Sequence, residues 1–116
     1  PRTMKITCLD ELPNQSVSHN REIQKKVMIA VNEIPHLTNF SQATFTPGQE
    51  AIAHAHDTMY EVFYIESGAG LVRVNGIEYA VKKGSCLVIE PKEIHEVINN
   101  SPGDLVINVI GVATTI

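Results

Sequence analysis

The chain has 116 residues, of which 43% are hydrophobic, and its formal net charge at pH 7 is −4. This length and composition fit one globular domain over residues 1–116, and they argue against a disordered chain. The net charge is negative and no run of Lys or Arg exceeds two residues, which excludes a phosphate-tracking surface, so nucleic acid is not an expected partner. No apolar run approaches the roughly 20 residues that span a bilayer, so a membrane is not an expected partner either.

The N-terminal part carries few structural signals. Residues 1–3 precede Met4 and are either the native start after removal of an initiator Met or an added remnant. Residues 10–26 are polar, which predicts a short helix or a loop leading into the first strand. Cys8 and Cys86 are too few and too far apart for a disulfide framework. With no visible signal peptide, we expect reduced thiols and a cytoplasmic location.

From residue 27 onward, short β-prone runs alternate with turn residues. Thr46-Pro47-Gly48-Gln49 is typical of a type II turn, and Asn75-Gly76 is the strongest short-range hairpin signal. The turns delimit nine predicted strands at 27–32, 37–45, 51–56, 60–66, 70–74, 77–82, 86–90, 94–99 and 104–112. Many short strands with turn residues between them predict an all-β sandwich or barrel.

Three histidines and one glutamate stand out from the predicted strands. His54 and His56 are two residues apart, so on a strand their imidazoles point to the same face. Glu61 lies in an apolar run, where a lone carboxylate is costly unless it is paired or bound to a metal. His95 follows another apolar run. Together these side chains are a mixed nitrogen and oxygen donor set for one divalent transition metal, namely Fe, Mn, Ni, Co, Cu or Zn.

The residues around this donor set resemble the two motifs of the cupin superfamily. The first motif reads Gly, five residues, His-x-His, three or four residues, Glu, six residues, Gly. It is matched at every fixed position, by Gly48, His54, His56, Glu61 and Gly68.

The second motif reads Gly, five residues, Pro-x-Gly, two residues, His, three residues, Asn. It is matched by Gly84, His95 and Asn99. Glu90 stands where Pro is usual and Lys92 where Gly is usual, which puts the backbone shape of the turn before His95 in question.

This resemblance covers residues 37–112 and implies a fold and an assembly. The implied fold is a small cupin of the conserved-barrel type, an all-β double-stranded β-barrel or jelly roll with the metal inside its mouth. The resemblance also implies a homodimer.

Five further residues are candidates for the surroundings of the metal. Phe63 and Ile65 share the face of Glu61 and Met59 lies in the turn at the mouth, so they either line a pocket or pack in the core. Glu90 either hydrogen-bonds a ligand histidine or lies at the rim near Lys92. Asn99 is expected to make a structural hydrogen bond rather than to bind metal.

The donor set leaves several functions open. Neutral histidines and one carboxylate around a divalent ion give a site of net charge +1, which favours a small oxygenated or acidic metabolite. We expect a metal-dependent enzyme, because the ligand set is complete and should leave open coordination sites, with dioxygenase chemistry ahead of an isomerase, lyase or decarboxylase acting on a sugar or keto acid. Isomerase or lyase chemistry needs a general base, and none is evident between Gly48 and Asn99. The alternative is a binding module without turnover. No catalytic residue beyond the metal ligands is assigned.

Overall fold

The computed structural model describes residues 4–17 and 20–115, and nearly all of its elements are strands. A short 3₁₀ helix, η1 (Leu9–Glu11), precedes them. The strands in chain order are β1 (Gln15–Val17), β2 (Asn20–Ile29), β3 (Leu37–Phe45), β4 (Glu50–His54), β5 (Met59–Ser67), β6 (Ala69–Val74), β7 (Ile77–Lys82), β8 (Cys86–Ile89), β9 (His95–Ile98) and β10 (Leu105–Ala113). Residues 1–3, interpreted above as a native start or a remnant, lie outside the described ranges. Within those ranges, no helix is long and apolar enough to cross a membrane.

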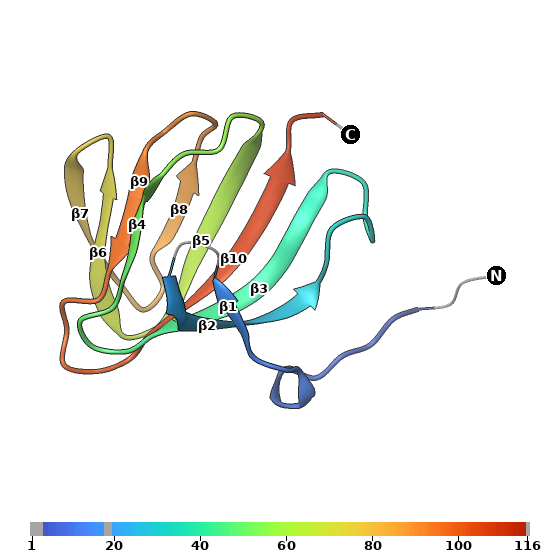
Figure 1. Ribbon diagram of the computed structural model, residues 1–116, viewed down its shortest axis with the longest axis horizontal. Coiled ribbons are helices and arrows are strands. Elements are labelled where there is room, and N and C mark those ends of the chain that lie inside the picture. Colours follow the sequence, from blue (N-terminus) through green and yellow to red (C-terminus); the bar gives the residue numbers. More distant parts are fainter. Residues whose placement is uncertain (1–3, 18–19, 116) are drawn as a thin grey trace.

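The strands form two antiparallel sheets that face each other across the core (Figure 1). One sheet has the order β1-β2-β3-β10-β5-β8, and the other has the order β4-β9-β6-β7. Strands that are distant in the chain therefore lie side by side, since β10 pairs with both β3 and β5. This is the double-stranded jelly-roll arrangement, and the predicted all-β fold class is confirmed. In the described residues the two sheets pair separately and do not close into one cylinder.

The core lies between the sheets because inward and outward side chains alternate along each strand. On β3, the inward residues Ser41, Ala43 and Phe45 are buried, whereas the residues between them are partly exposed. On β10, Leu105 and Ile107 are at most 1% exposed. The other buried hydrophobic residues of the described chain are Ile23, Ala51, Phe63, Ile65, Val72, Val81, Ile89 and Val97. Their burial is the main favourable contribution to folding.

Every strand predicted from residue 37 onward is present, with ends that differ by one or two residues. The hairpin predicted at Asn75-Gly76 joins β6 to β7, where Val74 pairs with Ile77. Asn75 and Gly76 have φ values of 49° and 83°, as a two-residue hairpin turn requires. Turn chemistry therefore determined the strand boundaries correctly in this part of the chain.

The prediction for residues 10–26 is wrong. This segment contains part of η1, all of β1 and the first part of β2, which begins at Asn20 instead of residue 27. β2 pairs with β1 on one side and with β3 on the other, so its backbone is hydrogen-bonded along both edges. Among the described residues of this segment, Ile23 alone is fully buried, so the polar composition hides the alternation that marks a strand.

Candidate metal centre

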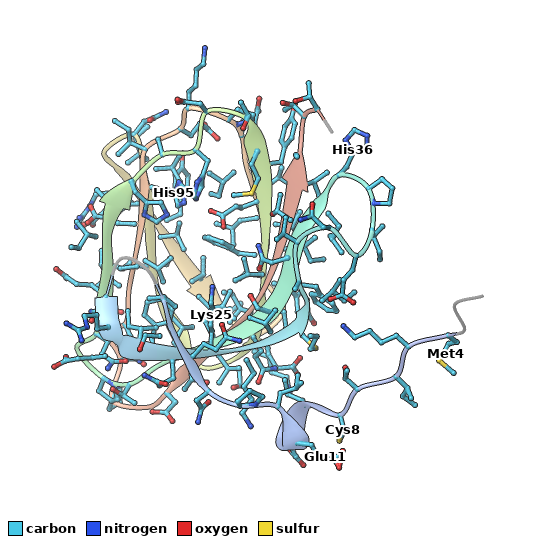
Figure 2. The ribbon with its side chains drawn as sticks, turned by 45° about the vertical axis from the view of Figure 1, so that its right-hand side comes forward. Met4, Cys8, Glu11, Lys25, His36 and His95 are labelled. Carbon is cyan, nitrogen blue, oxygen red and sulfur yellow. The ribbon has the colours of Figure 1, made fainter. Side chains whose placement is uncertain are left out.

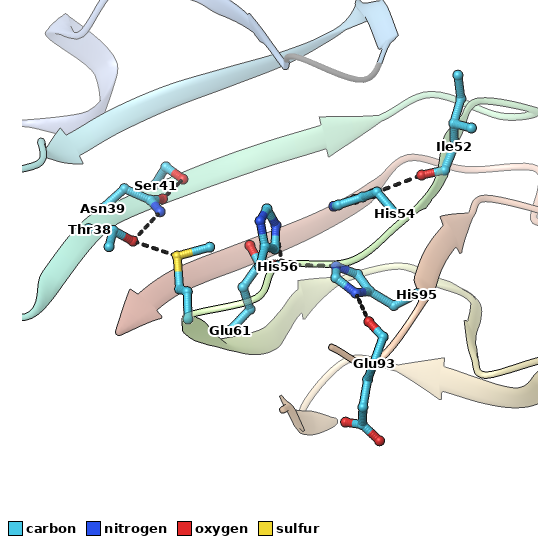
Figure 3. Close-up of polar contacts among 10 residues, drawn as sticks. Thr38, Asn39, Ser41, Ile52, His54, His56, Glu61, Glu93 and His95 are labelled. Carbon is cyan, nitrogen blue, oxygen red and sulfur yellow. Dashed lines mark hydrogen bonds and ion pairs between the residues drawn. The ribbon is translucent and has the colours of Figure 1, made fainter. Parts of the chain in front are cut away.

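The four predicted ligands meet at one end of the space between the two sheets, three of them from strands and one from a loop. His54 is the last residue of β4 and pairs with His95, the first residue of β9, so these two imidazoles are neighbours within one sheet. Glu61 belongs to β5 in the facing sheet. Figure 3 shows the side chains of His54, His56, Glu61 and His95 directed toward one another. The site therefore bridges the two sheets.

His56 reaches the site from a loop, not from the strand that carries His54. β4 ends at His54, and His56 lies in the connection to β5. The carbonyl oxygen of His56 accepts a hydrogen bond of 2.6 Å from the backbone N–H of Lys92. The expectation that strand alternation alone aligns the two imidazoles is corrected, because a tertiary backbone contact holds the second one.

The turn before His95 keeps its shape despite the two departures from the cupin motif. Lys92, at the position where Gly is usual, has a φ of 73°, in the left-handed region that glycine occupies without strain. The backbone N–H of Glu93 donates to the carbonyl of Glu90 at 3.2 Å, which closes the turn. The chain therefore tolerates an unfavourable backbone conformation at Lys92, costing about 1–2 kcal/mol.

Backbone acceptors determine which nitrogen of two histidines faces the site. Nδ1 of His54 lies 2.8 Å from the carbonyl oxygen of Ile52, and Nδ1 of His95 lies 3.0 Å from that of Glu93 (Figure 3). A carbonyl oxygen can only accept, so each Nδ1 must carry the proton and donate. In the neutral rings Nε2 then keeps its lone pair, which is the form that binds a metal.

The ligand atoms lie close enough together to share one ion. One oxygen of Glu61, Oε1, is 2.9 Å from Nε2 of His95 and 3.4 Å from Nε2 of His56. One ligand atom from each of the four residues lies within 4.8 Å of all the others. Metal bonds of about 2.1 Å place the ligands of one ion within about 4.2 Å of each other, so side-chain adjustments of about half an ångström suffice. The donor set therefore fits one divalent transition metal.

The carboxylate and the buried imidazole shift each other's protonation. Burial by itself raises the pKa of Glu61, but the hydrogen bond with His95 and the charges of His56, His95 and His54 outweigh burial and hold that pKa below its ordinary value of 4.5. Burial lowers the pKa of His95, but the hydrogen bonds to Glu61 and to the Glu93 carbonyl outweigh it and raise that pKa above 6.5. Without metal, His95 therefore holds its proton more tightly than a free histidine.

Metal binding is expected to weaken as the pH falls, because the proton on His95 competes with the metal for Nε2. The competition begins above pH 6.5, since the pKa of His95 is raised, and it grows steadily stronger as the pH falls below that pKa. Affinity should fall by about tenfold per pH unit for each histidine that must lose a proton. Metal content measured after dialysis at steps between about pH 8 and about pH 4 checks this. A content that stays constant down to the lowest step contradicts the ligand set.

The four ligands line a cavity of about 210 Å³ that reaches between the sheets. Its walls are mostly apolar and include Phe45, Phe63, Val97, Ile107 and Val109. Three polar side chains that sequence reasoning missed also line it, namely Lys25, Asn39 and Ser41. The predicted strand at 37–45 already placed Asn39 and Ser41 on one face by alternation, whereas Lys25 lay in the segment predicted as helix or loop.

The predicted neighbours of the metal lie in different places. Met59 and Phe63 line the cavity, and Met59 Sδ accepts a hydrogen bond of 2.9 Å from Thr38. Ile65 is fully buried in the core and is not among the cavity residues. Glu90 is exposed, and no hydrogen bond joins its carboxylate to a ligand histidine in the described residues. The backbone carbonyl of Glu93 takes the role considered for Glu90.

Asn99 makes structural hydrogen bonds, as expected. It is fully buried just beyond β9 and does not line the cavity. Its amide Nδ2 donates to the carbonyl oxygens of Phe45 and Gly103, each at 2.9 Å. Its Oδ1 accepts from both the backbone N–H and the hydroxyl of Ser101. Asn99 therefore joins the end of β3 to the loop before β10.

A jelly roll with three histidines and one glutamate gathered at its mouth is typical of a class of barrel proteins that bind a metal. The family model described as the cupin domain matches residues 41–111, and the chain belongs to this family. The matched residues include all four candidate ligands.

Two curated proteins match part of the chain. An uncharacterized protein of Methanocaldococcus jannaschii is 33% identical over 61 residues, which are 53% of this chain and 49% of the relative. The oxalate-binding protein of Thermotoga maritima is 29% identical over 66 residues, which are 57% of this chain and 54% of the relative. The match thus spans about half the length of each relative.

Solved structures resemble nearly the whole chain in fold. A predicted oxalate decarboxylase from T. maritima has a TM-score of 0.85 at 20% identity, covering 94% of this chain and 99% of the other. KdgF from a Halomonas species has a TM-score of 0.79 at 23% identity, covering 95% and 94%. At these identities the likeness establishes the cupin fold and leaves the reaction open.

Proposed function

We propose that this chain is a metal-dependent cupin that binds a small acidic or oxygenated metabolite directly at a divalent metal held by His54, His56, Glu61 and His95. The observation that carries the proposal is the prepared donor set. Two imidazoles already have Nδ1 committed to backbone carbonyls, and all four ligand atoms converge at the wall of the cavity. A bound divalent ion would supply a Lewis acid with open coordination positions beside that cavity.

The charge of the donor set supports an acidic ligand. Three neutral imidazoles and one carboxylate leave a net charge of +1 on the site with a divalent ion. The surrounding walls are largely apolar, so water screens this charge less than at an open surface. A carboxylate or an ionised hydroxyl of the ligand would offset the charge, and the Asn39 amide, which has a second N–H beyond the one that faces Thr38, would offer a hydrogen bond to its oxygen atoms.

The reaction class we propose first is oxygenation, with the iron-loaded protein as dioxygenase. Isomerase, lyase or decarboxylase chemistry on a sugar or keto acid needs a protein group that moves a proton. Among the described cavity residues, Lys25 has the only ionisable side chain outside the donor set, and a lysine ammonium group is not a ready base. Oxygenation makes no such demand on the chain, which is why it is placed first.

A second candidate is binding without turnover. It is favoured by the partial match to a protein named for binding oxalate, and by the lack of a general base in the described cavity. In this case the same four ligands would hold the ion, and the small acid would be retained unchanged. The homodimer expected from the sequence belongs to both proposals and stays a prediction.

The test is an anaerobic titration of the Fe²⁺-loaded protein with a catechol, a diketone, a 2-hydroxy acid and oxalate. We expect at least one of these chelating compounds to change the absorption spectrum, with no change in the His54→Ala variant. Air is then admitted, and oxygen uptake and products are measured. Oxygen uptake with a new product supports the dioxygenase, and recovery of the unmodified compound supports the binding module. No spectral change with any compound contradicts direct binding at the metal.

A further inference from the structure

The side chain of Lys25 faces the interior of the barrel. Lys25 lies on β2 two residues after Ile23, which is fully buried, so strand alternation directs both to the inner face. It is partly buried and lines the cavity that holds the four ligands. Figure 2 shows Lys25 and His95 both directed into the space between the sheets. The next lysine, Lys26, points the other way and donates to the carbonyl of Leu9 at 3.2 Å.

The ammonium group of Lys25 has no partner among the described residues. No hydrogen bond or ion pair to its Nζ occurs there, whereas Lys5 and Lys26 each have partners. Glu61 is the one carboxylate among the described cavity residues, and it is already within 3.4 Å of both His56 and His95. No fully buried side-chain nitrogen or oxygen of the described residues lacks a partner, so this ammonium group keeps contact with solvent. An anion in the cavity would give it a partner beside largely apolar walls, where water screens the attraction less than at an open surface.

Strand register places Lys25 well below the metal ligands. Lys25 pairs with Ala43, which lies in the same cross-strand row as Ile107 and Ile65. Glu61 pairs with Gly111 in a second row, and Glu61 is four residues from Ile65 on β5. The row of Lys25 and the row of Glu61 are therefore about 13 Å apart at 3.3–3.4 Å per residue. A lysine side chain spans about half of that distance. One ligand could therefore bind the metal and the Lys25 ammonium group together only if several carbons separate its two anionic groups.

Resting on the proposed function, we propose that Lys25 binds the second anionic group of an elongated dicarboxylate whose first carboxylate binds the metal. The metal with its ligands contributes a charge of +1 and Lys25 another +1, so the cavity as a whole complements a dianion. The apolar walls between the two charges suit the carbon chain of such a ligand. Oxalate, whose two carboxylates are directly bonded, could occupy the metal but could not reach Lys25 at the same time.

The experiment measures binding of succinate, glutarate and adipate to the Co²⁺-loaded protein, with butyrate, valerate and hexanoate as monocarboxylate counterparts. The visible spectrum of Co²⁺ reports coordination, and calorimetry gives Kd. We expect at least one dicarboxylate to bind about tenfold or more tightly than its counterpart. Lys25→Met, which keeps the apolar stem, should weaken that dicarboxylate about tenfold to hundredfold and leave the monocarboxylate unchanged. Lys25→Arg should retain most of the preference.

Lys26→Met is the matched control, since it removes the outward-facing lysine next in the chain, and it should bind both ligand series like the unmodified protein. Equal binding of mono- and dicarboxylates, or a dicarboxylate preference that survives Lys25→Met, overturns the role of Lys25. Cobalt content is measured in every variant. A protein that takes up cobalt but shows no such preference refutes this inference alone, whereas failure to take up cobalt refutes the metal function as well.

Discussion

Replacing His95 with alanine is expected to weaken metal binding by at least about hundredfold, because removing only a hydrogen-bond partner of a ligand already costs about 10–100-fold. His95 is 1% exposed, and its Nε2 lies 2.9 Å from Glu61. The variant therefore also leaves Glu61 without its nearest partner in a buried position, so loss of stability accompanies loss of metal. Titration with Co²⁺ and elemental analysis of the purified variant measure the effect.

Two further variants separate ligation from folding. His54→Ala removes a ligand that is less buried than His95, so it should lose metal while keeping more of its stability. His36→Asn is the matched control, because His36 lies outside the cavity and has a φ of 70° that asparagine tolerates. It should bind metal as the unmodified protein does. Undiminished metal binding in folded His95→Ala and His54→Ala variants would exclude the proposed donor set.

Replacing Gly68 with alanine is expected to lower the free energy of unfolding by about 4 kcal/mol, among the largest effects of single substitutions. Gly68 joins β5 to β6 with a φ of 85°, where an alanine costs about 1–2 kcal/mol for the backbone alone. A Cβ there would also lie 2.1 Å from the carbonyl oxygen of Asp104 and 3.0 Å from the Cα of Leu105. Both contacts are with backbone, so the loop before β10 must move. Urea unfolding followed by circular dichroism measures the loss.

Gly84→Ala is the control for the backbone contribution. Gly84 has a φ of 92°, and nothing lies within 4 Å of a Cβ built there. It should lose only about 1–2 kcal/mol. The difference between the two variants then isolates the contact with Asp104, and equal losses would contradict it.

The strands from Leu37 onward could be predicted because local signals agreed with the tertiary structure there. Asn75-Gly76 produced a tight hairpin, and the β-prone runs between turn residues each had a partner strand. β1 and β2 could not be predicted, because their polar residues carry little alternation. Pairing with β3, which is about twenty residues further along the chain, makes that segment a strand.

The candidate ligands could be predicted as residues, but their arrangement could not. Spacing in the chain singled out His54, His56, Glu61 and His95. It did not show that the Ile52 and Glu93 carbonyls orient two of the rings. These contacts depend on the local course of the backbone at strand ends, which residue type does not specify.

By itself, the sequence determined the all-β class, the turn positions and the identity of the donor set, because hydrophobic alternation, Asn-Gly and Gly signals and motif spacing are local properties of the chain. Only the tertiary structure decided what shares the cavity with those donors. Lys25 lies far from the motifs in sequence, and it faces the cavity because β2 adds to the sheet beside β3. Strand order in a jelly roll joins distant segments, so the composition of the cavity is a property of the fold.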